Sequence, residues 1–306
     1  MMNFLITVIS LLIVIKMADI FVDQATALSK KLKLSGFIVG FLIVSLGTTL
    51  PELSTSIYST LIGHKDIAIS NIIGSNIANI FFVLGLLAIS SKFKLQKIDI
   101  NFNIPLLLAI TFATVIVLFI NNLFFSSTLG IIFLCVFLVS TYLIYRNNHI
   151  EVVESKVKFN IFFLLGAVLV LFVFSKICID SILSLATDLK IPEVLTGYFL
   201  LAIGTSLPEL ATLHSSLKKG REDIGLGNII GSNMFNLLFL PGVISLISPM
   251  NLSAFKVEYI FVLLATVTLF VFGYMGKKYY FSKKEGFILI SFYILFALVQ
   301  ILRNIF

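Results

Sequence analysis

Apolar stretches of about 20 residues alternate with short polar segments along the whole 306-residue chain. A transmembrane helix needs roughly 20 apolar residues to cross about 30 Å of hydrocarbon. The pattern therefore predicts an all-α integral membrane protein with about ten transmembrane helices. The expected spans lie near residues 3–28, 36–62, 67–90, 101–120, 123–145, 159–187, 192–217, 224–248, 256–275 and 282–303.

The composition excludes a water-soluble domain. Hydrophobic residues make up 59% of the chain, charged residues only 12%, and the mean hydropathy is +1.10. Soluble domains carry about 25% charged residues. The first apolar stretch lacks a basic start and a small-residue cleavage signal, so it is expected to be the first span and not a removable signal peptide.

The net charge of +7 raises the question of an anionic partner such as nucleic acid. The basic residues gather after the odd-numbered predicted spans, at Lys30, Lys31, Lys33, Lys92, Lys94, Lys97, Arg146, Lys156, Lys158, Lys218, Lys219, Arg221, Lys277, Lys278, Lys283 and Lys284. This distribution follows the positive-inside rule. It predicts a multi-pass protein of the cell membrane with both termini outside the cytoplasm, and topology accounts for the charge without nucleic acid.

An internal repeat organises the chain, because residues 40–79 align without a gap onto residues 197–236. The best-matched segments are GTTLPEL (47–53) with GTSLPEL (204–210), and NIIGSNIAN (71–79) with NIIGSNMFN (228–236). The offset is 157 residues throughout, and each half holds five predicted spans. An odd number of crossings makes the repeats inverted, an arrangement that places ion sites near the midplane in transporters.

The repeat divides the chain into two five-helix units, residues 1–145 and 159–306, joined by a charged linker at 146–158. The linker is expected on the cytoplasmic side and is too short to form a domain of its own. We therefore expect a bare transport core without a regulatory domain.

One glutamate in each half falls near the middle of a predicted span. Glu52 and Glu209 each follow a proline, Pro51 or Pro208, which removes a helical hydrogen bond and disrupts the preceding turn. Helices 2 and 7 should therefore break. Helices 3 and 8, which carry the repeated GSN segments, are expected to break beside them. Ionisable residues at this depth are costly and usually mark a functional site.

The polar groups around the two glutamates are all oxygen ligands. They comprise hydroxyls, amide oxygens and freed main-chain carbonyls from Thr48, Thr49, Thr205, Ser206, Ser75, Ser232, Asn79 and Asn236. Oxygen ligands suit calcium and sodium, whereas zinc or copper sites favour His or Cys. Two negative charges match one divalent ion, so the sequence predicts a hard-cation site.

These motifs resemble the two alpha-repeats of sodium/calcium exchangers in the cation/calcium exchanger superfamily, and the ten-span layout resembles that of the prokaryotic members. The resemblance implies that Glu52 and Glu209 hold calcium together with the carbonyls of Thr48 and Thr205. It further implies sodium sites in the same cavity. The corresponding sodium ligands are Ser75 and Ser232 by side chain, and Ser45 and Ala202 by main chain. Family members often carry Asp where this chain has Asn79 and Asn236.

The function implied is secondary active antiport of calcium against sodium by alternating access, not enzymatic catalysis. The expected partners are the two ions and the lipid bilayer, with no prosthetic group and no obligate protein partner. A calcium/proton exchanger is the nearest alternative, because protonating two carboxylates also releases a divalent ion. An intramembrane enzyme is much less expected, because the sequence shows no paired nucleophile and base. A passive cation channel is also much less expected, and it would be recognised by flux that does not depend on a countertransported ion.

Two charged pairs lie inside the first and sixth predicted spans. Lys16 with Asp19, and Lys176 with Asp180, are spaced for pairing along one helix. Structural pairing within each helix is the favoured interpretation. The family resemblance implies that these two long helices slide during transport, so a gating role is the alternative.

Overall fold

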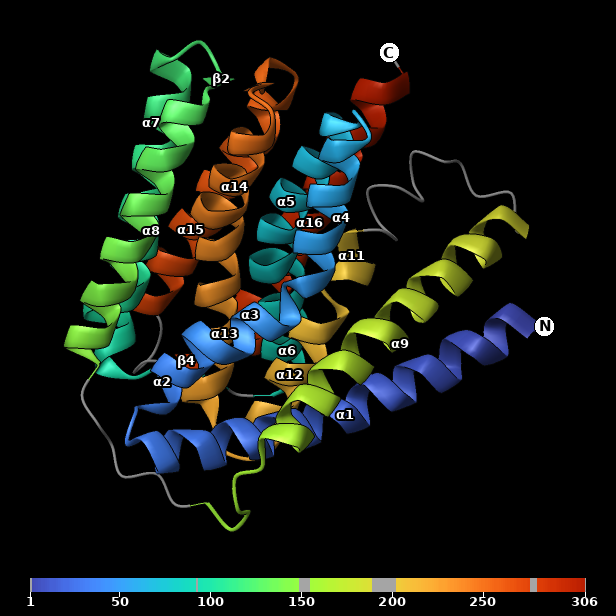
Figure 1. The fold of residues 1–306 in the computed structure, drawn as a ribbon, viewed down its shortest axis with the longest axis vertical. Helices are drawn as coiled ribbons and strands as arrows, with labels where there is room; N and C mark the ends of the chain where they lie inside the picture. Colours follow the sequence, from blue (N-terminus) through green and yellow to red (C-terminus); the bar gives the residue numbers. More distant parts are fainter. Residues whose placement is uncertain (1, 92, 149–154, 189–201, 276–279, 306) are drawn as a thin grey trace.

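The computed structural model describes residues 2–91, 93–148, 155–188, 202–275 and 280–305, and most of this chain is helical (Figure 1). Eight helices in these ranges are long and apolar enough to cross a membrane, and a bent helix pair brings the number to nine. The first part of the expected span at 192–217 lies outside the described residues, and so does part of the linker at 146–158. A multi-pass membrane protein is confirmed.

The first half begins with the longest helix among the described residues. Its elements are α1 (Met2–Leu32), α2 (Gly36–Val39), η1 (Gly40–Val44), α3 (Ser45–Thr48), α4 (Leu50–Leu61), α5 (Lys65–Ile77), η2 (Ala78–Leu84), α6 (Gly85–Ser90), β1 (Phe93–Lys94), η3 (Asp99–Asn103), α7 (Ile104–Ile120), β2 (Phe124–Phe125) and α8 (Ser127–Asn147). Segments η1, η2 and η3 are π-helical.

The second half follows a closely related order. Its described elements are α9 (Ile161–Asp188), α11 (Ala202–Thr205), α12 (Leu207–Lys218), α13 (Glu222–Met234), η5 (Phe235–Phe239), α14 (Leu240–Ile247), β3 (Met250–Asn251), η6 (Ser253–Phe255), α15 (Lys256–Met275), β4 (Tyr280–Phe281) and α16 (Lys283–Ile305). Segment η5 is π-helical and η6 is a 3₁₀ turn.

The break predicted in helix 2 lies at Thr49, two residues before Pro51. Thr49 separates α3 from α4 with φ −85° and ψ 5°, and the two parts of the span bend by 47°. Ser206 separates α11 from α12 with nearly the same angles, φ −86° and ψ 7°. Proline stands in the first turn of both α4 and α12, where its missing N–H costs no helical hydrogen bond.

Helices 3 and 8 differ from the prediction, because neither is broken. Residues Lys65–Ser90 and Glu222–Ile247 each form a continuous span. Each span instead contains a π-helical segment, η2 or η5, that begins after the GSN motif and one further residue, Ile77 or Met234. A π segment inserts an extra residue into the helical turn, and such segments occur frequently at functional sites. The GSN motif is therefore followed by a locally widened helical turn and not by a break in the helix.

Helices α1 and α9 lie side by side and cross the other helices obliquely (Figure 1). Val14 and Phe21 of α1 share a small apolar cluster with Leu164 and Leu171 of α9. A separate, larger core joins the remaining helices, from α5 through α8 and from α13 through α16. The long pair is thus packed as a unit against the bundle.

The sequence suggested that Asp19 of α1 pairs with Lys16, but the structure shows no such pair. The ion pairs in the described part of the chain are Lys219–Asp23, Arg221–Asp223 and Arg303–Glu258. The Asp19 carboxylate instead accepts a hydrogen bond of 2.6 Å from Ser215 of α12. The pairing predicted within α1 was therefore wrong, because a tertiary contact of Asp19 outcompetes spacing along one helix. Lys176 and Asp180 likewise form no ion pair in the described chain.

Two short antiparallel sheets connect the halves. In one, Phe93 of β1 lies opposite Phe281 of β4, and in the other, Phe124 of β2 lies opposite Asn251 of β3. Each sheet takes one strand from each half, and β2 and β4 lie toward opposite ends of the bundle (Figure 1). The paired backbone groups fasten the loops that connect the core helices.

Candidate cation site

Glu52 and Glu209 occupy equivalent places in the two halves. Each lies in the first turn of the helix that follows a break, α4 or α12, and each side chain is 0% exposed. Ser75, which contacts the Glu52 carboxylate, also lies 3.2 Å from Thr205, one turn before Glu209. The structure therefore brings together the two acids that the repeat predicted.

Serines from the adjacent helices bind the carboxylates in the same way. The Ser75 hydroxyl of α5 donates to Glu52 Oε1 at 3.2 Å, and the Ser232 hydroxyl of α13 donates to Glu209 Oε1 at 3.3 Å. The other oxygen, Oε2, of each glutamate is buried and has no hydrogen-bond partner in the described chain. Each acid is thus held at one oxygen and leaves the second available.

Threonines from the opposite half complete each cluster. The Thr205 hydroxyl lies 3.2 Å from the Ser75 hydroxyl, and the Thr48 hydroxyl lies 3.5 Å from that of Ser232. Thr48 and Thr205 are the last residues of α3 and α11, immediately before the two breaks. The site is therefore interlaced, with each glutamate facing hydroxyls from both halves.

The two asparagines predicted as ligands lie at the π-helical segments. Asn79 is the second residue of η2, and Asn236 is the second residue of η5. Both are 0% exposed, and none of their four side-chain polar atoms has a partner among the described residues. An unsatisfied buried polar group costs about 1–3 kcal/mol, so such a concentration requires a physical explanation.

The remaining predicted ligands have more varied surroundings. The Ser206 hydroxyl is buried and unpartnered in the described chain, whereas the Thr49 hydroxyl donates to the Ser45 carbonyl at 2.7 Å. That carbonyl also accepts the Thr48 hydroxyl at 3.3 Å and the Thr49 N–H at 2.9 Å. Ala202 begins α11, so its main chain lies one turn before the break.

Sequence reasoning missed Asn71 and Asn228, which lie one helical turn before Ser75 and Ser232. Asn71 donates to Ser56 at 3.3 Å, and Asn228 accepts the Thr48 hydroxyl at 3.0 Å. Both asparagines begin the repeated NIIGSN segment, so their identity at the 157-residue offset was an available signal. The repeat shows that the position matters, but it does not show which groups each amide contacts.

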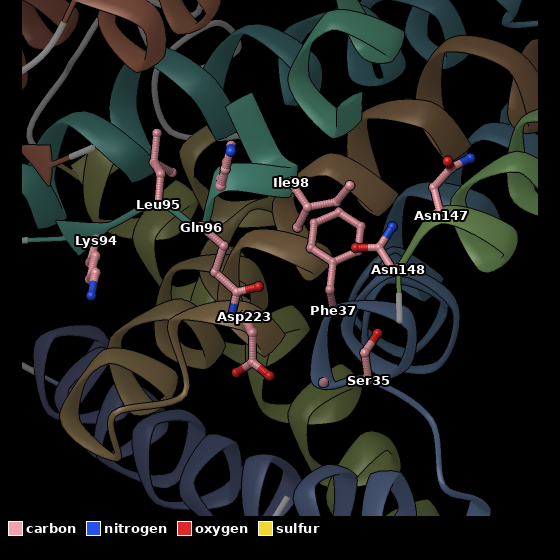
Figure 2. Close-up of a pocket in the computed structure, with 11 residues that line it drawn as sticks. Ser35, Phe37, Lys94, Leu95, Gln96, Ile98, Asn147, Asn148 and Asp223 are labelled. Atoms are coloured by element: carbon pink, nitrogen blue, oxygen red, sulfur yellow. The ribbon is translucent and has the colours of Figure 1, made fainter. Parts of the chain in front are cut away.

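A pocket of about 530 Å³ lies elsewhere, where α2 and α13 begin and α8 ends (Figure 2). Its lining includes Ser35, Phe37, Gln96, Ile98, Asn148 and Asp223. Arg221 binds both oxygens of the Asp223 carboxylate, at 3.0 and 2.8 Å. This pocket contains neither buried glutamate, so it is not the cation site.

The described residues contain no cluster of three or more His, Cys, Asp or Glu side chains that could hold a metal ion. The two glutamates are instead surrounded by hydroxyl and amide oxygens. Hard cations with flexible oxygen coordination, such as calcium and sodium, fit this donor set, whereas zinc or copper would favour nitrogen and sulfur.

Comparison with known proteins gives the same result across the chain. The profile of the family described as sodium/calcium exchanger protein matches residues 2–146 and 159–302. The chain belongs to the sodium/calcium exchanger family. The match covers both halves and omits only the linker and the ends of the chain, so the family assignment does not rest on the motifs alone.

Individual relatives within the family align over most of their length. Inner membrane protein YrbG of Escherichia coli is 32% identical over 276 residues, which is 85% of each chain. Putative antiporter CaxA of Alkalimonas amylolytica is 30% identical over 304 residues, or 94% of each chain. A solved structure of the sodium-calcium exchanger NCX_Mj superposes with a TM-score of 0.82 at 26% identity, covering 96% of this chain and 97% of that one. Membership of the exchanger family places the chain among transporters and not among enzymes.

Proposed function

We propose that this protein is a secondary active antiporter that exchanges calcium for sodium across the cell membrane by alternating access. The observation that carries the proposal is the pair of fully buried carboxylates at repeat-related helix breaks, each with one unpartnered oxygen. A divalent cation between them neutralises both charges. Family membership supports the same function, and it favours the sodium-coupled antiporter over an enzyme or a channel.

The proposed calcium ligands are Glu52 and Glu209 with the carbonyls of Thr48 and Thr205. The proposed sodium ligands are the Ser75 and Ser232 side chains with the main chains of Ser45 and Ala202. Further oxygens come from Asn79, Asn236, Thr49 and Ser206. The Ser45 carbonyl already accepts three hydrogen bonds, so it is the least available ligand of the set.

Exchange follows from competition for these shared oxygens. Calcium bound between two carboxylates leaves a site with no net charge, and so do two sodium ions. When neither calcium nor sodium is bound, two buried carboxylates have no positive charge to balance them, and burying such charges is costly. The site therefore favours a loaded state before the helices rearrange, and this preference couples the fluxes of the two ions.

We further propose that residues 1–145 and 159–306 are five-helix repeats of inverted topology, connected by a cytoplasmic linker at 146–158. Strands β1 and β3 are offset by 157 residues, the same as the sequence repeat. Gly63 and Gly220 share that offset, and both have positive φ, 89° and 64°, in the turn after the glutamate-bearing helix. With both termini extracytoplasmic, Gly63 faces outside and Gly220 faces the cytoplasm.

Single cysteines test this topology. In a background with Cys135 and Cys178 replaced by alanine, Gly63→Cys should react with a membrane-impermeant thiol reagent in intact cells. Gly220→Cys should react only in inside-out vesicles. Labelling of both positions from the same side contradicts the inverted arrangement.

Radiolabelled calcium uptake into proteoliposomes tests the transport function. An outward sodium gradient should drive calcium uptake, whereas potassium and proton gradients of equal size should not. Uptake driven by the proton gradient alone would assign the chain to calcium/proton exchange. Uptake down the calcium gradient that ignores every counterion would indicate a channel.

A further inference from the structure

Asn71 and Asn228 occupy the same position in the two repeats but make different contacts. Both lie one turn before the serine that binds a glutamate, and they are 4% and 0% exposed. Neither residue is among the proposed calcium and sodium ligands. Their hydrogen bonds nevertheless end in the cation site.

Asn71 acts within its own half. Its Nδ2 donates to the Ser56 hydroxyl at 3.3 Å and to the Glu52 carbonyl at 3.5 Å. Both acceptors belong to α4, so the amide ties α4 to α5. The second half has Leu213 where the first has Ser56, and it cannot repeat this contact.

Asn228 acts across the two halves. Its Oδ1 accepts a 3.0 Å hydrogen bond from the Thr48 hydroxyl, at the end of α3. The same hydroxyl lies 3.5 Å from Ser232, which in turn donates to Glu209 at 3.3 Å. Asn228 Nδ2 is buried and has no partner in the described chain. The acceptor oxygen is thus the part of this amide that makes a contact.

We propose that Asn228 is a positioning residue that orients the Thr48 hydroxyl, so that its oxygen binds the cation alongside the Thr48 carbonyl. This inference rests on the proposed function. A hydroxyl has one proton and two lone pairs. A cation ligand must point a lone pair at the ion, so its proton needs an acceptor elsewhere. Asn228 Oδ1, at 3.0 Å, is a nearer acceptor for that proton than the Ser45 carbonyl at 3.3 Å, and it leaves the Thr48 oxygen free to face the cluster around Glu209. The equivalent Asn71 is a donor and does not perform this role.

A double-mutant cycle on the full-length protein tests the proposal, with calcium affinity measured by titration calorimetry in detergent. Asn228→Ala should weaken calcium binding about three- to tenfold, as expected for one hydrogen bond. Thr48→Val should weaken it by at least as much. Because Asn228 acts through Thr48, adding Asn228→Ala to Thr48→Val should cause no further loss.

Conservative variants distinguish positioning from a structural role. Asn228→Asp keeps the size and an acceptor oxygen and replaces the unpartnered amino group with a carboxyl oxygen, which adds a negative charge when ionised, so affinity should be no lower than in the original protein. Asn228→Leu keeps the volume without the acceptor and replaces the Ala variant if that one does not fold. A structural role predicts equal losses for Asp, Ala and Leu.

Asn71→Ala is the matched control, and its effect should add to that of Thr48→Val. Additivity of Asn228→Ala with Thr48→Val overturns the proposal, and so does an Asn228→Asp variant as weak as Asn228→Ala. Glu209→Gln separates this failure from that of the proposed function. If Glu209→Gln abolishes calcium binding while Asn228→Ala has no effect, only the positioning role is wrong. If Glu209→Gln leaves binding intact, the site itself is wrong.

Discussion

The two halves of the protein are nearly identical at the glutamates and differ toward the ends of the same helices. Glu52 and Glu209 each accept a serine hydroxyl and leave one oxygen unpartnered in the described chain. Toward the end of α12, Ser215 binds Asp19 of α1, and Lys219, the residue that follows α12, binds Asp23 of α1. The two halves are therefore alike where they meet at the glutamates, and they differ where the end of α12 contacts α1.

The equivalent positions on α4 make no such contacts. Tyr58 and Ile62 stand where α12 has Ser215 and Lys219, and they are 65% and 51% exposed. Repeat symmetry therefore describes the ion site but not its surroundings. The differences indicate that α12 is tethered to the long helix pair by polar contacts and that α4 is not.

The first prediction concerns the symmetric part of the molecule and has the largest effect. Glu52→Gln and Glu209→Gln should each reduce sodium-driven calcium flux at least about 100-fold, because either change leaves one buried carboxylate to balance a divalent ion. Similar losses in both variants would support equal roles for the two halves. Glu285→Gln, which alters a glutamate that contacts Ser282 at the start of α16, is the control and should transport normally.

The second prediction concerns the close packing of α13 against α2 at Gly227. A Cβ on Gly227 of α13 would lie 2.3 Å from the Phe37 carbonyl oxygen of α2, so the backbone must move. Gly227→Ser should destabilise the protein by about 1–3 kcal/mol, as overpacking does. Thermal unfolding in detergent measures this loss.

The first half offers a matched control for that substitution, because Ser70 stands at the equivalent position of α5. Ser70→Gly opens space and should change stability by less than about 1 kcal/mol, the ordinary cost of glycine in a helix. Equal losses in Gly227→Ser and Ser70→Gly would show that the packing difference between the halves has no energetic consequence.

The third prediction concerns the tether between α12 and α1 and has the smallest effect on stability. Lys219 Nζ lies 2.6 Å from Asp23 Oδ1, but the two side chains are 24% and 43% exposed. Lys219→Ala should therefore cost no more than about 1 kcal/mol, and less at high salt. Ile62→Ala is the control at the equivalent position, and its stability should not depend on salt.

Much of the architecture could be predicted because it depends on local patterns. Apolar run length located the described spans to within a few residues, and Pro51 and Pro208 located the two breaks. The two buried glutamates followed from their position within apolar spans and from the repeat. These features depend on hydropathy, proline geometry and sequence identity, all of which can be read along a single segment.

Features that depend on contacts between distant segments could not be predicted in this way. Asp19 has Lys16 at a suitable spacing, yet Ser215 of α12 provides its hydrogen bond. The GSN motif signals a special backbone but does not distinguish a break from the π-helical segments η2 and η5. Asn71 and Asn228 each begin the same NIIGSN segment, and only the tertiary structure shows that one donates and the other accepts.

The central claim is that both halves contribute to one shared cation site, and equilibrium binding tests it most directly. Radiolabelled calcium titrated against the purified protein should saturate at one ion per chain, and sodium should displace it completely. Two calcium ions per chain, or a calcium ion that sodium cannot displace, would contradict a single site shared by Glu52 and Glu209.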